Sequence, residues 1–178
     1  MKKMIVVVAA FLLICTAAFA DHPNDSWAIG AIGGGSVGLY GADLVGIGHV
    51  GFNLKAPKLP IFWGFYSHIS NWGVGLSITG DFYILDKSIV EKEVTNEDGS
   101  YDLKLDWYLG IGGLFDFYVG DYYINAGLRI PGGVSWHIIK PVELSVGVAP
   151  GFGITTYHPK PKFHFTLPFE ISARFWFL

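Results

Sequence analysis

The chain has 178 residues and is rich in glycine (24 residues) and aromatic side chains (16%), but only 15% of its residues are charged. Soluble domains carry about 25% charged residues, so the composition argues against an ordinary water-exposed surface. The formal net charge is −3, and lysines and arginines do not cluster. The chain therefore lacks the basic patch that marks nucleic-acid-binding proteins, and we expect no nucleic-acid partner. The length suits one domain of roughly 100 to 200 residues.

The N-terminus has the order of regions found in a secretory signal peptide. Lys2 and Lys3 precede an apolar run over residues 5–14, and small residues lead to the sequence Ala18-Phe19-Ala20. The apolar run is shorter than the roughly 20 residues that a membrane-spanning helix needs. We therefore expect residues 1–20 to be a cleaved signal peptide and residues 21–178 to form a single domain.

The only cysteine, Cys15, lies inside this leader. It follows Ile14, whereas a lipoprotein acceptor cysteine follows a small residue, so the sequence favours simple cleavage before Asp21. The mature chain then contains no thiol, which excludes disulfides and cysteine chemistry.

Two long segments alternate apolar and polar side chains with a period of two, the signature of β-strands. In Leu103 to Val119, one face holds leucine, isoleucine, tryptophan and phenylalanine, while the other holds Lys104, Asp106 and Asp116. The segment Phe163 to Phe177 alternates in the same way. Both exceed the roughly 9 to 11 residues that a tilted strand needs to cross a bilayer.

Six further segments have the same alternation in a weaker form. An even number of strands returns both chain ends to one side, as in single-chain bacterial barrels. The fold predicted for residues 27–178 is therefore an all-β, eight-stranded, antiparallel, up-and-down transmembrane β-barrel. The six segments are Trp27–Val37, Leu44–Leu54, Ile61–His68, Val74–Leu85, Ile124–Ile130 and Val142–Ile154.

The composition of the polar face indicates which face meets lipid. A soluble lipocalin-like barrel would turn its apolar face inward, but the polar face here is rich in glycine, serine, threonine and tyrosine and poor in lysine, which suits a crowded lumen. We expect a polar network there, in which buried charges pair with one another; a gated pore or a proton path is the alternative. Its predicted members are Lys104, Asp106, Asp116, Arg129, Glu143, Glu170 and Arg174.

Membrane barrels carry an aromatic girdle at each interface, with aliphatic residues between the two. Threading the eight strands up and down gathers aromatic residues at both rims. The predicted girdle residues are Trp107, Phe115, Phe117, Trp136, Phe163, Phe165, Phe175 and Phe177.

This strand pattern, together with the aromatic C-terminal strand FEISARFWFL, resembles the small outer-membrane barrels of the OmpA, OmpX and OmpW type. The resemblance implies residence in the bacterial outer membrane, contact with its lipids and insertion by the barrel assembly machinery. Members of that group end in an aromatic residue. In this chain Phe177 is followed by Leu178, so the terminal signal is displaced by one position.

The threading places the longest connection, Asp86 to Asp102, at the end of the barrel that carries both chain ends, and the tight Gly120-Asp121 turn at the opposite end. In the resembling families, long loops are extracellular. We therefore expect either a miscounted early strand or a hairpin that projects on the periplasmic side.

The segment YSHISN has a weaker, local resemblance to the outer-membrane lipid A 3-O-deacylases, in which a histidine and a serine act as base and nucleophile. That resemblance implies catalysis by His68 and Ser70, with Asp81 as the nearest acidic residue. Asp81 follows Ser70 by eleven residues where that family has a glutamate at twelve. Because serine and asparagine before Gly73 are also ordinary turn residues, we favour the non-catalytic interpretation.

No sequence motif predicts a cofactor or a metal. Gly33, Gly35 and Gly38 match a glycine-rich phosphate loop but lack the following helix that gives such a loop its mechanism, and the six histidines are dispersed. We therefore expect a non-enzymatic outer-membrane barrel with a structural, adhesive or small-solute and lipid-handling role. The alternatives are a lipid A esterase using His68 and Ser70, and a soluble periplasmic lipocalin-like binder.

Overall fold

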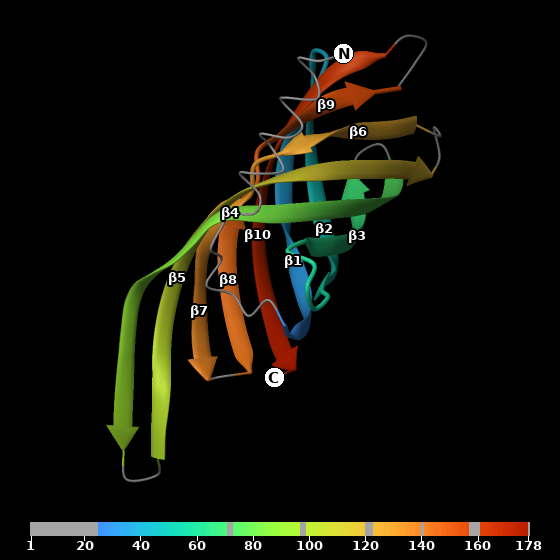
Figure 1. The fold of residues 1–178 in the computed structure, drawn as a ribbon. Helices are drawn as coiled ribbons and strands as arrows, with labels where there is room; N and C mark the ends of the chain where they lie inside the picture. The colour runs from blue at the N-terminus through green and yellow to red at the C-terminus, as the bar shows by residue number, and fades with distance from the viewer. Residues whose placement is uncertain are drawn as a thin grey trace, which may run out of the picture.

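The computed structural model describes residues 25–70, 73–96, 99–119, 123–139, 141–156 and 161–177. These residues form one antiparallel sheet of ten strands (Figure 1). The predicted signal peptide, the Gly120-Asp121 turn and Leu178 lie outside the described residues. The strands are β1 (Trp27–Tyr40), β2 (Asp43–Lys55), β3 (Phe62–Ser70), β4 (Gly73–Asn96), β5 (Gly99–Val119), β6 (Tyr123–Arg129), β7 (Gly132–Ile139), β8 (Val142–Val148), β9 (Gly151–Thr155) and β10 (Lys162–Phe177).

The ten strands occupy eight positions around a closed ring. Each position is called a stave and holds either one strand or two strands placed end to end. β6 and β7 both pair with β5, one above the other, and β8 and β9 both pair with β10. Each of these pairs is therefore one stave interrupted at a proline, Pro131 or Pro150. β1 pairs with both β2 and β10, which closes the ring. The predicted eight-stranded antiparallel barrel is confirmed, and its ladders leave no open edge around the ring.

The stagger of the barrel can be read from its cross-strand partners. Followed from neighbour to neighbour around the ring, the partners of Ala28 lead back to Gly38 on the same strand, ten residues further along. A stagger of this kind accompanies strand tilt in every closed barrel. All residues on this path are buried and face the lumen. In order, the path is Ala28, Lys55, Phe62, Asp81, Gly112, Arg129, Gly151, Thr166 and Gly38.

The apolar face of the sheet points outward. In β10, Phe163 is 65% exposed and Ile171 is 56% exposed, while His164 between them in sequence is fully buried. Most inward side chains are polar or aromatic, with a few aliphatic ones such as Val45 and Ile47, and they include Glu143 and Asn125, which are also fully buried. This is the reverse of a lipocalin, whose apolar face lines the interior, so the lipocalin-like alternative does not fit the structure.

The connection from Asp86 to Asp102 is not a loop. The ladder between β3 and β4 ends at Asp81, but β4 and β5 remain paired with each other as far as Asn96 and Gly99. The resulting hairpin projects from the end of the barrel at which β10 finishes, as the sequence threading predicted (Figure 1). Register shifts at Tyr83/Leu85 and Ser88/Val90 mark β-bulges in β4, which bend the strand as it leaves the ring.

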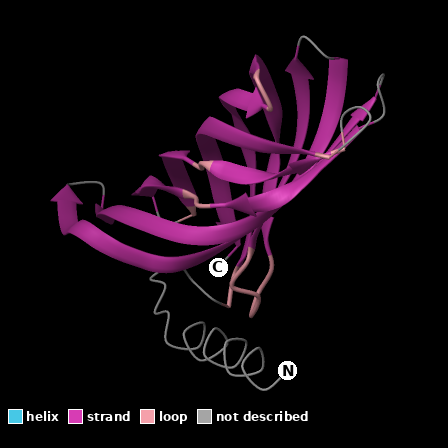
Figure 2. Cartoon of the chain, turned by 90° about the horizontal axis from the view of Figure 1, so that it is seen from above, coloured by secondary structure: helices cyan, strands magenta, loops and turns pink. Residues whose placement is uncertain are grey.

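The described chain is almost entirely strand, with short connections (Figure 2). Among these residues, no helix is long and apolar enough to cross a membrane.

Candidate functional site: the polar lumen

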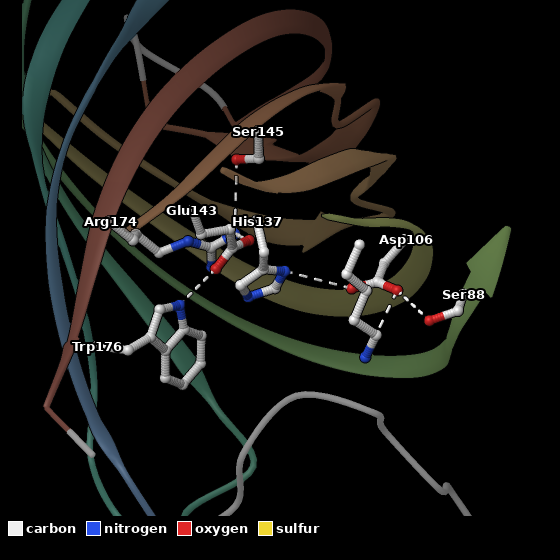
Figure 3. Close-up of polar contacts among 8 residues, drawn as sticks. Ser88, Asp106, His137, Glu143, Ser145, Arg174 and Trp176 are labelled. Atoms are coloured by element: carbon white, nitrogen blue, oxygen red, sulfur yellow. Dashed lines mark hydrogen bonds and ion pairs between the residues drawn. The ribbon is translucent and has the colours of Figure 1, made fainter. Parts of the chain in front are cut away.

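A fully buried ion pair lies in the lumen toward the end at which β1 begins and β10 finishes. Arg174 Nη2 donates to Glu143 Oε1 at 2.6 Å and Trp176 Nε1 donates to Glu143 Oε2 at 2.7 Å (Figure 3). The guanidinium group also lies 4.8 Å from the ring centroid of Phe62, so a cation–π contact supports it. Arg174 and Glu143 are direct cross-strand partners. The register of the β8–β10 ladder therefore brings the two opposite charges together.

A second ion-pair cluster is centred on Arg129. Its Nε lies 3.1 Å from Asp81 Oδ1 and its Nη2 donates to Glu170 Oε2 at 2.8 Å. The hydroxyl of Tyr66 donates to the other oxygen of Glu170 at 3.4 Å. One cation thus bridges two carboxylates from opposite sides of the barrel, which satisfies charges that would be costly to bury alone.

Toward the other end of the lumen, uncharged hydrogen-bond donors surround the carboxylate of Asp116. Asp116 accepts a short hydrogen bond from Ser77 and a bond of 3.2 Å from Asn125 Nδ2. His68 Nδ1 lies 3.3 Å from the hydroxyl of Tyr118. Ser77 and Asn125 are the direct cross-strand partners of Asp116, so this cluster also follows from the register.

A fourth cluster ties the base of the hairpin to the barrel wall. Asp106 on β5 accepts a hydrogen bond of 2.6 Å from Ser88 on β4, and its carboxylate lies 3.5 Å from His137 Nδ1 on β7 (Figure 3). Lys104 Nζ is 3.6 Å from the same carboxylate. The cluster joins three staves at the point where the hairpin leaves the ring.

Two cavities lie between these clusters. The upper cavity, toward the end at which β10 begins, has about 60 Å³ of space for water-sized molecules, and the lower cavity, toward the end at which β10 finishes, has about 30 Å³. Tyr66, Thr79 and Glu170 line both cavities and separate them. A single water needs about 10 to 15 Å³ on this scale, so each of these two cavities has room for a few water molecules and neither has the width of a porin channel.

The predicted lumen residues all lie on the inner face, and each contacts a partner in one of these clusters. Among the acidic residues in these ion pairs, Glu170 is the most exposed, with 15% of its side chain accessible to solvent. The sequence prediction missed Asp81 as a partner of Arg129, and it missed His137, Ser88 and Trp176. The alternation places Asp81 and Trp176 on the inner face, but the sequence gives no cross-strand register to match them with partners. Ser88 and His137 lie outside the predicted strands.

The predicted girdle residues lie on the outer face in two bands. Phe177 pairs with Trp27, and Phe175 pairs with Ile29, at the end where β1 begins and β10 finishes. Trp107 and Trp136 lie on neighbouring staves at the same end, and Trp107 is half-buried. The remaining four residues lie toward the opposite end: Phe115, Phe117, Phe163 and Phe165.

The structure separates the residues of the hypothetical esterase site. His68 is buried in the lumen, and Ser70 lies at the end of β3, where it pairs with Gly73. Asp81 pairs with Phe62, six residues from His68 along β3, or about 20 Å at strand spacing. Asp81 is also engaged by Arg129. Asp81 therefore does not orient His68.

Within the described segments, no group of three or more histidine, cysteine, aspartate or glutamate side chains has the spacing of a metal site. His49 and His68 are cross-strand partners. A Cβ atom on Gly34 would lie 3.0 Å from His49 Nε2, whereas one on Gly75 would clash with His68 Nε2. The two imidazoles therefore lean toward glycines on opposite neighbouring strands and do not converge.

The comparisons with known proteins match this chain to no family. No protein-family model matches the sequence, and no curated protein matches it. Among solved structures, the chain is similar to the crystal structure of Neisserial surface protein A (NspA), with 9% identity and a TM-score of 0.44, over 85% of this chain and 97% of that chain.

Proposed function

We propose that the mature chain is a non-enzymatic β-barrel of the bacterial outer membrane, exported by the signal peptide and inserted by the barrel assembly machinery, with a closed lumen. The observation that carries this proposal is the orientation of the sheet: bulky apolar side chains cover the outside of the ring, and paired polar groups fill its inside. A surface of this kind is stable in hydrocarbon, and a closed ring satisfies the backbone there. In water, so large an apolar surface would aggregate.

The first test is solubility. Purified mature chain should need detergent to remain monodisperse, and it should fractionate with outer membranes. It should also migrate differently on gels before and after boiling, because the closed barrel resists unfolding by detergent. Recovery of a monodisperse protein in plain buffer, or from the soluble periplasmic extract, would contradict membrane residence.

The second test concerns the lumen. Across the interior, Tyr66 on β3 donates to Glu170 on β10, and Arg174 on β10 packs over Phe62 on β3; Tyr66 and Glu170 line both cavities. Planar bilayers containing the protein should therefore lack the sustained large conductance of a porin. Under this proposal the barrel acts through its surface, or through small molecules that enter its cavities, and not as a diffusion channel.

A further inference from the structure

Three prolines lie side by side on adjacent staves and interrupt the barrel wall along one line, the proline seam. Pro131 separates β6 from β7, Pro150 separates β8 from β9, and Pro168 faces them from β10. The ladders of β10 stop at Phe169 on the β8 side and resume at Thr166 on the β9 side. Figure 1 shows β6 and β9 running in a different direction from β7 and β8, so the wall bends along the seam.

The carbonyl oxygen of each proline accepts one backbone hydrogen bond at the seam, but the proline nitrogen cannot donate a second one to the same partner. Gly110 N donates to Pro131 O at 2.7 Å, Ile130 N to Pro150 O at 2.9 Å, and Ala149 N to Pro168 O at 3.1 Å. In an antiparallel ladder, such residues would exchange two bonds, and a proline nitrogen has no hydrogen to donate. Three neighbouring strand interfaces therefore lose a bond at the same level.

The position of the seam makes this loss unusual. On β10, Pro168 lies between the aromatic residues Phe163 and Phe165 at one end and Phe175 and Phe177 at the other. In hydrocarbon there is no water to replace a missing backbone bond. Proline is ordinarily confined to edge strands and bulges, and this ring has no edge. The seam is thus a line in the wall at which hydrogen bonding between staves is reduced.

The upper lumen cavity lies directly behind the seam. Pro168 and Thr166 on β10, Arg129 on β6 and Leu114 on β5 line it. Side chains pack closely against Gly151, which follows Pro150: a Cβ there would lie 2.8 Å from Leu114 Cδ2 and 2.9 Å from Thr166 Oγ1. The side chains of Leu114 and Thr166 therefore lie between the cavity and the interrupted ladder.

The cavity has aromatic walls and unused hydrogen-bonding atoms. Tyr66 and Tyr118 form part of the lining, and Ser36 Oγ, His49 Nε2 and His68 Nε2 are buried without a hydrogen-bond partner in the structure. Buried polar groups ordinarily find partners, so each such atom requires an explanation. A small molecule with an apolar body and a hydrogen-bonding group would match both features of this lining.

We propose that the proline seam is a lateral port through which small, neutral, amphipathic molecules dissolved in the bilayer enter the upper cavity. This inference rests on the membrane residence proposed above. It adds a ligand class, neutral molecules of a few non-hydrogen atoms, and a route that does not pass through either mouth of the barrel.

The port can be tested by cysteine labelling, because the chain from residue 21 onward contains no native cysteine. Ser36→Cys places a thiol in the cavity, opposite Pro168 in the ladder. In lipid vesicles, N-ethylmaleimide, which is small and neutral, should modify it. A permanently charged trimethylammonium thiosulfonate reagent should react at least tenfold more slowly.

The decisive comparison restores the missing donors with Pro131→Ala and Pro150→Ala together, since neither proline is among the described residues that line the cavity. The rate of N-ethylmaleimide labelling of Ser36→Cys should fall at least tenfold in this background. An unchanged rate would mean entry through a barrel mouth and would overturn the port. Val37→Cys, on the outer face, is the matched control and should react equally in both backgrounds.

The same control separates the two proposals. If Val37→Cys reacts readily with the charged reagent, the outer face is in water and membrane residence fails. If it resists that reagent and only the seam comparison fails, the port alone is wrong. Should the double variant not fold, hydrogen exchange of the native protein decides: peptides that span Gly110, Ile130 and Ala149 must exchange faster than those in the flanking ladders, and equal protection overturns the port.

Discussion

Arg129 and Asp81 form an ion pair across Gly112, which lies between them on the intervening strand. The three residues are successive cross-strand partners on β6, β5 and β4, and Arg129 Nε is 3.1 Å from Asp81 Oδ1. Because Gly112 has no side chain, the two charged groups can meet over its backbone. Gly75 occupies the same kind of position between His68 and Tyr118. At both positions, a glycine on the middle strand lets side chains on the two flanking strands contact each other.

Gly112→Ala should disrupt the first of these contacts. Its Cβ would clash with Asp81 Oδ1 and lie 2.8 Å from the carbonyl oxygen of Gly80. Overpacking of this type costs about 1 to 3 kcal/mol, and separation of the ion pair would add to this cost. Denaturant titration of the folded barrel in detergent, followed by the gel shift on heating, measures the loss.

Gly113→Ala is the matched control for that variant. Gly113 is the next residue but faces outward, and a Cβ there would meet nothing within 4 Å. Its substitution should leave stability unchanged or slightly raised, because alanine loses less backbone entropy on folding than glycine. Equal destabilisation by both substitutions would show that the lumen contact at Gly112 is not the cause.

The buried pair of Arg174 and Glu143 should depend strongly on both partners. Glu143→Gln leaves the guanidinium group buried without its counter-charge, which typically costs 3 to 5 kcal/mol. The double variant Glu143→Gln with Arg174→Met should recover part of that loss, since it removes both charges. A double-mutant cycle of unfolding free energies measures the coupling.

Lys104→Met provides the comparison for this cycle. Lys104 pairs with Asp106 at 3.6 Å and its side chain is 23% exposed, so solvent screens the pair and its loss should cost no more than about 1 kcal/mol. A loss as large as that of Glu143→Gln would contradict the assignment of the strongest electrostatic contribution to the buried pair.

The sequence predicted the staves but not the contacts between them. Alternation alone assigned Glu143 and Arg174 to the inner face, and it assigned Phe163 and Ile171 to the outer face. It could not reveal that Glu143 lies opposite Arg174, because a β-ladder register depends on turns and bulges throughout the ring. Each of the pairs Ser77–Asp116, Asp116–Asn125 and Ser145–Ser172 became visible only once the register was known.

The hairpin beyond the ring shows a different limit of sequence reasoning. The charged segment after Asp86 was interpreted as a connection because its apolar alternation is interrupted, yet it is paired strand as far as Asn96. The bulges at Tyr83/Leu85 and Ser88/Val90 break the period of two without ending the strand. A search for strict alternation therefore does not predict that the strand continues beyond a bulge.

The local resemblance of His68 and Ser70 to an esterase site leads to a negative prediction. Asp81 on β4 lies opposite Phe62, six residues along β3 from His68, and forms an ion pair with Arg129. The carboxylate that a catalytic histidine needs is therefore not next to His68. Ser70→Ala should therefore leave the acylation pattern of lipid A unchanged relative to the wild type, as measured by mass spectrometry. Accumulation of a more highly acylated lipid A in the variant would revive the enzymatic alternative.

The outer face of β10 offers a direct measurement of membrane depth. Ile171 and Phe163 are both exposed on this strand, but Ile171 lies between the aromatic bands and Phe163 lies within one of them. Arginine at the bilayer midplane costs about 2 to 4 kcal/mol, and near the interface about 0 to 1 kcal/mol. Ile171→Arg should therefore destabilise the folded barrel in lipid vesicles by roughly 2 kcal/mol or more beyond Phe163→Arg. Both substitutions introduce the same charge on the same strand, so their difference reports depth and not strand propensity. If the two variants unfolded at the same denaturant concentration, the outer face would not be buried in hydrocarbon.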